Sequence, residues 1–328
     1  MLLLASFITT RFGEWRQTWH GMPRKTRVGE KVSAHVPVEN EGALVAFDLS
    51  RKRTLWSIAL DTPTGFDWVD DGFIAINSMY GNRTLLLDDR AQATRSIAMH
   101  LMNDLHSLVS TPRGILITSS GVDGILELSA SGAVVWSWIA SEHGLDRTPN
   151  GRVRKVETGT DHRRHTISTE DQSTHCNSAR LSQNDGRDVV VATLFHQGQI
   201  IQIDRSSLST SVRAFGLRHP HSLRPYGTGW IVCDSRPGSV VILDDDLWVT
   251  DIVEDDFNWV QDAVPVPDEN VVLIADANNA RIVVWSMESG KKLDELKYPG
   301  EWKIYQMEIV PKDRELAVRA IGAKEHGR

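Results

Sequence analysis

Cysteine is scarce in this chain of 328 residues, which contains only Cys176 and Cys233. Two cysteines do not provide the disulfide framework typical of small secreted domains. No stretch approaches the roughly 18 consecutive apolar residues that a transmembrane helix needs. The apolar residues 1–10 lack the basic flank and the length of a secretory signal peptide, so they are predicted to form a strand. Together these absences predict a protein of the reducing cytoplasm.

Long basic runs are also absent. The chain has 36 Lys and Arg against 43 Asp and Glu, a formal net charge of -7. Without a basic stripe to neutralise phosphates, neither a nucleic acid nor a membrane is expected as a partner, whereas a protein partner stays open. Phosphate-binding glycine loops, dinucleotide fingerprints and nucleophile elbows are missing as well, so no nucleotide cofactor is expected.

A repeated pattern does run through the chain. A polar residue is followed by a short apolar run, a turn and a second apolar run, and most intervals between repeats are near the roughly 40 to 45 residues of a four-stranded propeller blade. The aligned position is polar in five repeats and a methionine in the sixth: Asp67, His106, Asn177, His221, Asp262 and Met307. One longer interval contains the insertion 141–172.

This spacing predicts an all-β fold, a six-bladed β-propeller that forms a single domain over residues 1–328. Residues 304–310 and 315–321 read as the first two strands of a blade, and residues 42–49 and 54–60 as the last two. Joining them would close the ring in one composite blade without exposed sheet edges. If residues 2–8 add a further strand, seven blades are the alternative. Residues 10–40 show no periodicity and receive no predicted structure.

Three histidines of this pattern form the candidate catalytic site. The first strand of each blade lines the central channel, so His106, His175 and His221 are expected to converge there. Three imidazoles with an open position can bind a divalent metal, zinc or another transition metal. Asn177, two residues after His175, would point the same way along the strand. The alternative is that these polar groups only satisfy strand-end amides and water.

Further residues are candidates for substrate binding. Asp67 or Asp262 would add a carboxylate beside the histidines. The insertion 141–172 ends just before His175 and is predicted to be a lid, because long loops inside compact domains are often functional. Its His162 and Arg163 either fold over the channel or stay solvated, and Arg236 either reaches the channel or remains in its turn.

One part of the sequence resembles a known family. The tryptophan-rich run 132–138, the loop with His143 and His162, and Thr174-His175-Cys176-Asn177-Ser178 are similar to bacterial arylsulfotransferase-like β-propellers. The resemblance covers about residues 130–205. It implies that a channel histidine carries a sulfuryl group, with His221 as the nucleophile and His175 and His106 beside it.

The chain departs from that family at Phe195. The resemblance implies an arginine before His196-Gln197, and its loss would remove a bidentate clamp for the transferred oxyanion. Three functions therefore stay open. The first is metal-assisted chemistry of a lyase or hydrolase on a small organic substrate in the channel, and the second is histidine-mediated sulfuryl transfer. The third is a non-catalytic binding module, because residues 220–223 and 275–282 resemble NHL propellers.

Overall fold

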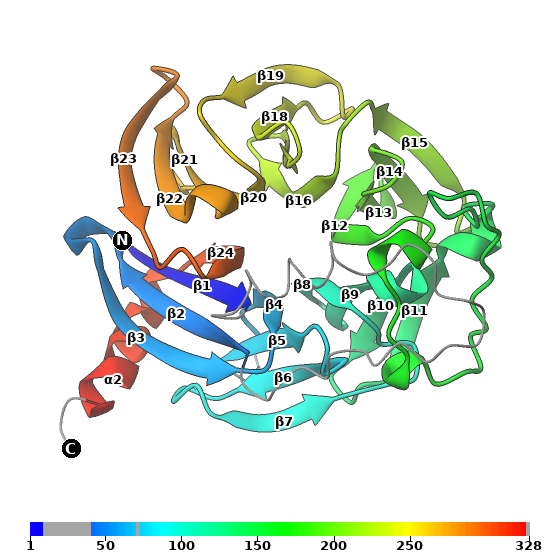
Figure 1. The fold of residues 1–328 in the computed structure, drawn as a ribbon, viewed down its shortest axis with the longest axis horizontal. Helices are drawn as coiled ribbons and strands as arrows, with labels where there is room; N and C mark the ends of the chain where they lie inside the picture. Colours follow the sequence, from blue (N-terminus) through cyan, green and yellow to red (C-terminus); the bar gives the residue numbers. More distant parts are fainter. Residues whose placement is uncertain (9–40, 70–72, 326–328) are drawn as a thin grey trace.

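The computed structural model describes residues 1–8, 41–69 and 73–325, and it forms a six-bladed β-propeller. Six four-stranded antiparallel sheets stand around a central channel, each with its first strand innermost (Figure 1). The predicted fold class and blade number are confirmed. Among the described residues, no helix is both long enough and apolar enough to cross a membrane.

Five blades are continuous in sequence, and their strands follow one another from the channel outward. The first blade has β4 (Pro63–Asp67), β5 (Ile74–Ser78), β6 (Arg83–Leu87) and β7 (Ala93–Ile97), and the second has β8 (Leu105–Thr111), β9 (Gly114–Ser119), β10 (Gly124–Ser129) and β11 (Val134–Ile139). The third has β12 (Cys176–Asn184), β13 (Arg187–Leu194), β14 (Gln199–Asp204) and β15 (Thr210–Phe215), and the fourth has β16 (Pro220–Tyr226), β17 (Gly229–Asp234), β18 (Ser239–Leu243) and β19 (Val249–Glu254). The fifth has β20 (Val260–Pro265), β21 (Val271–Asp276), β22 (Arg281–Ser286) and β23 (Lys291–Lys297).

The hydrophobic core lies between neighbouring blades rather than at the centre. The second strand of each blade is covered on both faces, so it reads as an almost unbroken apolar run. Val189, Val190, Val191 and Ala192 of β13, for example, are all buried. The outermost strands face solvent on one side, and their sequences are correspondingly more polar. The central channel is therefore left to polar side chains.

The sixth blade joins the two ends of the chain. Its strand order is β24 (Lys303–Ile309), β1 (Leu2–Ile8), β2 (Gly42–Asp48) and β3 (Arg53–Leu60). The predicted composite blade is confirmed, but its second strand is β1. Because β1 fills this position, pairing with both β24 and β2, it completes the sixth blade rather than adding a seventh.

The predicted strand over residues 315–321 is wrong. These residues belong to the helix α2 (Glu315–Glu325), which lies outside the sixth blade (Figure 1). Their Glu, Leu, Ala and Arg content favours a helix once β1 has taken the place in the sheet. The helix is anchored where Trp56 Nε1 donates to the carbonyl of Val318 at 2.6 Å.

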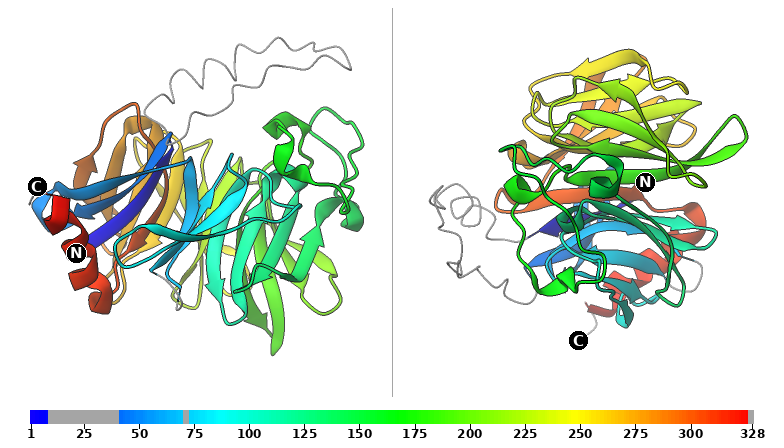
Figure 2. Two further views of the ribbon diagram at one scale, coloured as in Figure 1. Left: turned by 90° about the horizontal axis from the view of Figure 1, so that it is seen from below. Right: turned by 90° about the vertical axis from the view of Figure 1, so that its right-hand side faces the viewer.

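The insertion folds as a series of short 3-10 turns on one side of the ring. They span Ala140–His143, His162–Arg164 and Thr169–Asp171 (green, Figure 2). Two amide side chains hold it to earlier blades: Asn103 Nδ2 donates to the carbonyls of His162 and His165, and Asn82 Nδ2 to that of Arg163. The insertion is thus fixed along the end of the channel where the inner strands begin. Residues 10–40, which received no predicted structure, lie outside the described residues.

A buried arginine links three inner strands at the other end of the channel. Arg224 of β16 binds both carboxylate oxygens of Asp262 at 3.0 and 2.9 Å, Glu308 at 2.7 Å and the carbonyl of Met307 at 2.7 Å. Asp262 also accepts from the amide of Met307 at 2.7 Å. This network joins β16, β20 and the closing strand β24.

We expect Arg224→Ala to lower the free energy of unfolding by about 3–5 kcal/mol, because it leaves the buried Asp262 charge without its partner. Arg213→Ala is the control, since that arginine contacts the exposed Asp246 at 3.5 Å and should cost less than about 1 kcal/mol. Urea unfolding followed by tryptophan fluorescence measures both. Equal losses would contradict the bridging role.

Candidate functional site

The chain makes the same unusual turn before five of the six inner strands. The residue directly preceding each strand has a positive φ, between 40° and 65°. These residues are Thr62, Asp104, His175, His219 and Trp259. Such a φ is uncommon outside glycine and is held only where the surroundings impose it. The turn brings a second layer of side chains to the channel mouth, ahead of the strands themselves.

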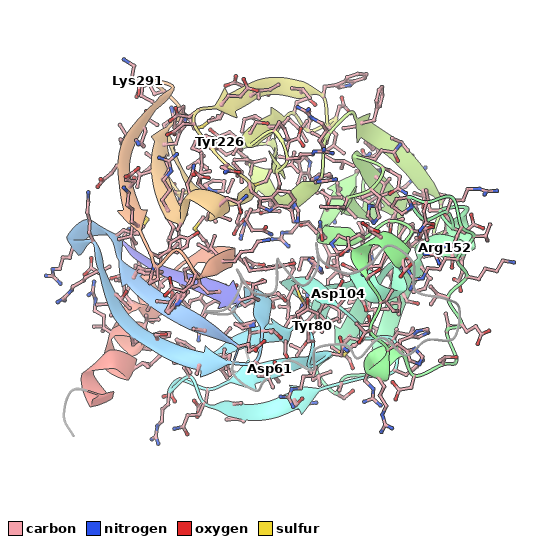
Figure 3. The ribbon with its side chains drawn as sticks, in the orientation of Figure 1. Asp61, Tyr80, Asp104, Arg152, Tyr226 and Lys291 are labelled. Atoms are coloured by element: carbon pink, nitrogen blue, oxygen red, sulfur yellow. The ribbon has the colours of Figure 1, made fainter. Side chains whose placement is uncertain are left out.

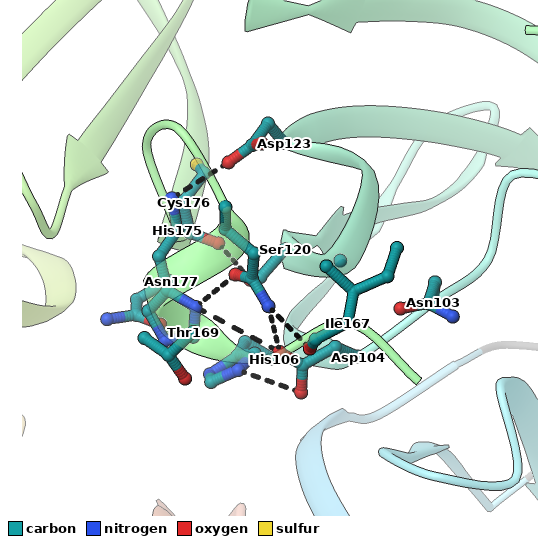
Figure 4. Close-up of polar contacts among 12 residues, drawn as sticks. Asn103, Asp104, His106, Ser120, Asp123, Ile167, Thr169, His175, Cys176 and Asn177 are labelled. Atoms are coloured by element: carbon teal, nitrogen blue, oxygen red, sulfur yellow. Dashed lines mark hydrogen bonds and ion pairs between the residues drawn. The ribbon is translucent and has the colours of Figure 1, made fainter. Parts of the chain in front are cut away.

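Asp123 imposes this turn on His175. Its carboxylate accepts hydrogen bonds from three consecutive amides, those of Ser173, Thr174 and His175, at 2.8, 2.8 and 2.9 Å. Arg154 of the insertion pairs with the same carboxylate. A buried charge is thereby matched by a guanidinium and by peptide donors, which offsets its desolvation. The segment 173–175 is consequently fixed in place (Figure 4).

All six inner strands carry a register shift close to the channel mouth. After one or two regular pairs with the neighbouring strand, such as Cys176 with Leu194, one or two residues are left outside the ladder. A β-bulge of this kind re-aims the side chain of the extra residue. The skipped residues are Asn177, Ser222, Gln261 and Tyr305 in four strands, and Thr64 with Gly65 and His106 with Ser107 in the other two. His221 directly precedes Ser222 and is itself paired with Cys233, yet it lines the same cavity as His106 and Asn177.

This register partly agrees with the sequence alignment. His106, Asn177 and His221 do share one layer of the channel, whereas Gln261 and Tyr305 stand where the alignment had Asp262 and Met307. Thr64 stands where it had Asp67. These positions lie one, two and three residues before Asp262, Met307 and Asp67, and the apolar pattern does not reveal the bulges that cause the difference. The sequence alignment therefore missed Tyr305 and Gln261, although both lie near the start of an inner strand, as His106 does.

Asp104, His106 and His175 form the one potential metal-binding cluster among the described residues. One ligand atom from each lies within 4.8 Å of the other two. Asp104 Oδ1 is 3.4 Å from His106 Nε2, and the two imidazole rings meet edge to face at 4.6 Å. Asp104 lies close to the ring's centre, whereas Arg152 and Lys291 lie on its periphery (Figure 3).

Gln172 sets the tautomer of His175. Its Nε2 donates to Asp104 Oδ2 at 2.8 Å, so its Oε1 faces His175 Nδ1 and accepts a hydrogen bond from it. The proton of neutral His175 is therefore on Nδ1, and the lone pair is on Nε2. Gln172, the last residue of the insertion, thus orients both a carboxylate and an imidazole of the cluster.

Tyr305 supports His106 from the closing strand. Its hydroxyl contacts His106 Nδ1, and its ring centroid is 5.4 Å from the imidazole. Burial raises the pKa of Tyr305 well above its usual value. The phenol is therefore protonated at neutral pH and can serve either as a donor or as an acceptor to His106.

His221 lies apart from this cluster. Its Nδ1 donates to the carbonyl of His219 at 2.9 Å and to Ser235 Oγ at 2.8 Å, which leaves the Nε2 lone pair unprotonated. The ring of Phe195 contacts both His175, at 4.9 Å, and His221, at 5.4 Å. Phe195 therefore packs between the two histidines. The structure brings His106 and His175 together but not all three histidines.

Burial keeps these histidines uncharged. It lowers the pKa of His175 well below 6.5, and neighbouring His106 adds to the effect. The pKa of His221 is also well below 6.5, through burial and the charge of Lys303. Both are neutral imidazoles at physiological pH, the form that binds a metal or accepts a proton.

The cavity beside this layer is small. It is lined by His106, Asn177, His221, Gln261 and Tyr305, among others, and measures about 20 Å³. This volume accommodates about one water molecule or ion. In this conformation the histidine end of the channel fits an ion better than an organic molecule.

The other predicted residues are engaged elsewhere. Asp67 accepts from the amides of Trp68 and Ser110, at 2.8 and 2.7 Å, and Asp262 binds Arg224. In the insertion, His162 Nε2 contacts the Glu157 carbonyl at 2.9 Å, and Arg163 pairs with Asp161 at 2.7 Å. Arg236 is exposed, although its charge contributes to a lowered pKa of His219 that arises first from burial.

Comparisons with known proteins identify the fold alone. No family model matches the chain, and no curated protein does. Solved β-propellers are similar in structure. A nidogen/laminin complex aligns over 94% of this chain and 97% of its own, with 10% identity and a TM-score of 0.60. A protein of unknown function from Bacteroides caccae aligns over 81% and 93%, with 13% identity and a TM-score of 0.59. A streptogramin B lyase aligns over 73% and 70%, with 10% identity and a TM-score of 0.50.

Stability should fall as the pH drops below about 6.5, because the unfolded chain then binds protons that buried His221 and His175 do not. Above that pH both states are neutral and the term vanishes. We expect His221→Gln to reduce the slope of unfolding free energy against pH by up to about 1.4 kcal/mol per unit. Urea titrations between pH 7 and 5 measure it. His165→Gln, at an exposed site, should leave the slope unchanged, and equal slopes in all three proteins would refute the assignment.

Proposed function

We propose that this propeller is a metal-dependent enzyme of the lyase or hydrolase type. The observation that supports it is the donor set at the channel mouth, a carboxylate from Asp104 and the imidazoles of His106 and His175. Two histidines and one carboxylate suit divalent transition metals. A bond from His175 to a metal would come from Nε2, because Gln172 holds Nδ1, the nitrogen that lies 3.9 Å from Asp104 Oδ2.

A divalent cation held by these groups would supply a Lewis acid that polarises a substrate carbonyl or hydroxyl. The chain's own residues supply the rest. Gln172 and Tyr305 hold the two imidazoles in orientation, as outer hydrogen-bond partners do in metal sites. His221, neutral and with a free Nε2, is the group in this channel that can accept a proton from the substrate.

We expect one divalent metal per chain in protein purified without an affinity tag, measured by elemental analysis. Asp104→Asn and His175→Ala should each remove it or weaken Zn²⁺ binding by at least about 10–100-fold, measured by titration calorimetry. His100→Gln, an exposed histidine on the same side, is the control and should keep the metal.

His221→Ala separates two ligand sets. It should retain the metal if Asp104, His106 and His175 are the ligands, and lose it if all three histidines are required. If the wild type contains no stoichiometric metal and binds none in titration, the proposal fails.

Sulfuryl transfer is the second candidate, and the anchored tautomer of His221 favours it. The Nε2 lone pair could take the sulfuryl group from an aryl sulfate as the S–O bond to the phenolate breaks. The group would then pass to an acceptor hydroxyl, whose proton is released. The absence of an arginine at Phe195 counts against this candidate.

For sulfuryl transfer, p-nitrophenyl sulfate should release p-nitrophenol only when a phenolic acceptor is present. His221→Ala should lower the rate by at least about three orders of magnitude, since the nucleophile is lost. His100→Gln again serves as the control. Release that survives His221→Ala would eliminate this candidate.

A further inference from the structure

The end of the channel opposite the histidines contains a larger hollow. It measures about 360 Å³, the lower range for sites of small organic ligands. Its walls are largely apolar, with three prolines and two branched residues. These are Pro225, Val264, Pro265, Pro267 and Ile309. The polar groups that reach it are Arg180, Arg224 and Glu308.

Arg180 lies between the two cavities. It lines both the histidine cavity and the larger hollow, and it follows Asn177 by three residues along β12. At about 3.3 Å per residue, this spacing is roughly 10 Å along the channel. Of the two arginines that line the hollow, Arg180 is the one that also reaches the histidine cavity.

This guanidinium is buried but poorly satisfied. Arg180 is 8% exposed, and its single hydrogen bond within the described part of the chain runs from Nη1 to the carbonyl of Ala179 at 3.2 Å. No described carboxylate lies within ion-pair distance of it. Burial, together with the charge of Arg224, lowers the pKa of Arg180 to about 10. A guanidinium has five N–H donors, so most of them are left to a ligand or solvent.

Arg224 shows the contrast. It is equally buried, yet Asp262, Glu308 and the carbonyl of Met307 accept from its Nε, Nη1 and Nη2. Those acceptors are thereby used within the protein. Asp67 is likewise satisfied by two backbone amides. The fold thus uses four of the five donors of Arg224 but one donor of Arg180, which faces the hollow.

From this geometry we infer that the hollow binds a small organic carboxylate, with its carboxylate on Arg180 and its apolar body against the proline walls. A planar guanidinium matches a carboxylate through two parallel hydrogen bonds. The negative charges of Glu308, Asp67 and Asp262 act on Arg180 from beyond ion-pair distance, and they disfavour an anion with two charges. The inference is independent of the proposed metal, because none of these residues belongs to the metal cluster.

Benzoate is the probe, with acetate and sulfate for comparison. We expect benzoate to bind the full-length protein more tightly than acetate, which lacks an apolar body, and more tightly than sulfate, which is doubly charged. Arg180→Met keeps the side-chain volume and should weaken benzoate binding by at least about tenfold, measured by ligand-observed NMR titration at constant ionic strength. Arg180→Lys keeps the charge without the fork and should give an intermediate affinity.

Arg213→Met is the control, since this arginine lies on the outer strand β15, and it should bind benzoate as the wild type does. Arg180→Met should fold with unchanged or raised stability, because it removes a buried charge that the protein does not pair. Three outcomes would overturn the inference. They are no benzoate binding up to about 10 mM, equal benzoate affinity in Arg180→Met and the wild type, and sulfate bound more tightly than benzoate. A large loss of stability in Arg180→Met would also overturn it, since Arg180 would then serve the fold.

Discussion

The pairing of β1 with β24 is the interaction on which the rest of the molecule depends. It turns an open array of blades into a ring and supplies both strands with partners that an edge would leave unpaired. Ser6 ties this blade to its neighbour by donating to the carbonyl of Thr64 at 2.7 Å and accepting from the amide of Gln306. Ring closure also delivers Tyr305 to His106 across 199 residues of sequence. The candidate site is therefore complete only in the closed ring.

Polar groups are tolerated in the channel because carboxylates bind backbone amides there. Asp123 holds three amides of the segment before β12, and Asp262 holds the amides of Ala263 and Met307 together with Arg224. Each such carboxylate satisfies donors that a strand end or a bulge leaves outside the ladder. The acidic residues nearest the axis are thus largely structural. This explains why Asp67 and Asp262, attractive as ligands in sequence, are committed to the backbone.

The repeat spacing was enough to predict six blades and a composite sixth, since the alternation of apolar runs and turns reports strand order directly. It also placed His106, Asn177 and His221 in one layer. It could not reveal the bulges, which depend on hydrogen bonds rather than hydrophobicity, so Gln261 and Tyr305 were missed. Nor could it show the positive φ that lets Asp104 and His175, one position before their strands, reach the layer of His106. The helix over Glu315–Glu325 was misassigned because β1 had not been given its place in the sheet.

Phe195 helps to explain why the two ends of the channel differ in chemistry. It packs between His175 and His221 and stacks on His219 at 4.1 Å, so an apolar ring separates the metal-type cluster from His219 and His221. An arginine there would bring a charge beside imidazoles that burial keeps neutral, and would lower their affinity for a cation. Among the described channel residues, the arginine without a carboxylate partner is instead Arg180, three residues after Asn177 along β12. The channel therefore offers lone pairs at one end and hydrogen-bond donors at the other, an arrangement that would orient any ligand reaching both.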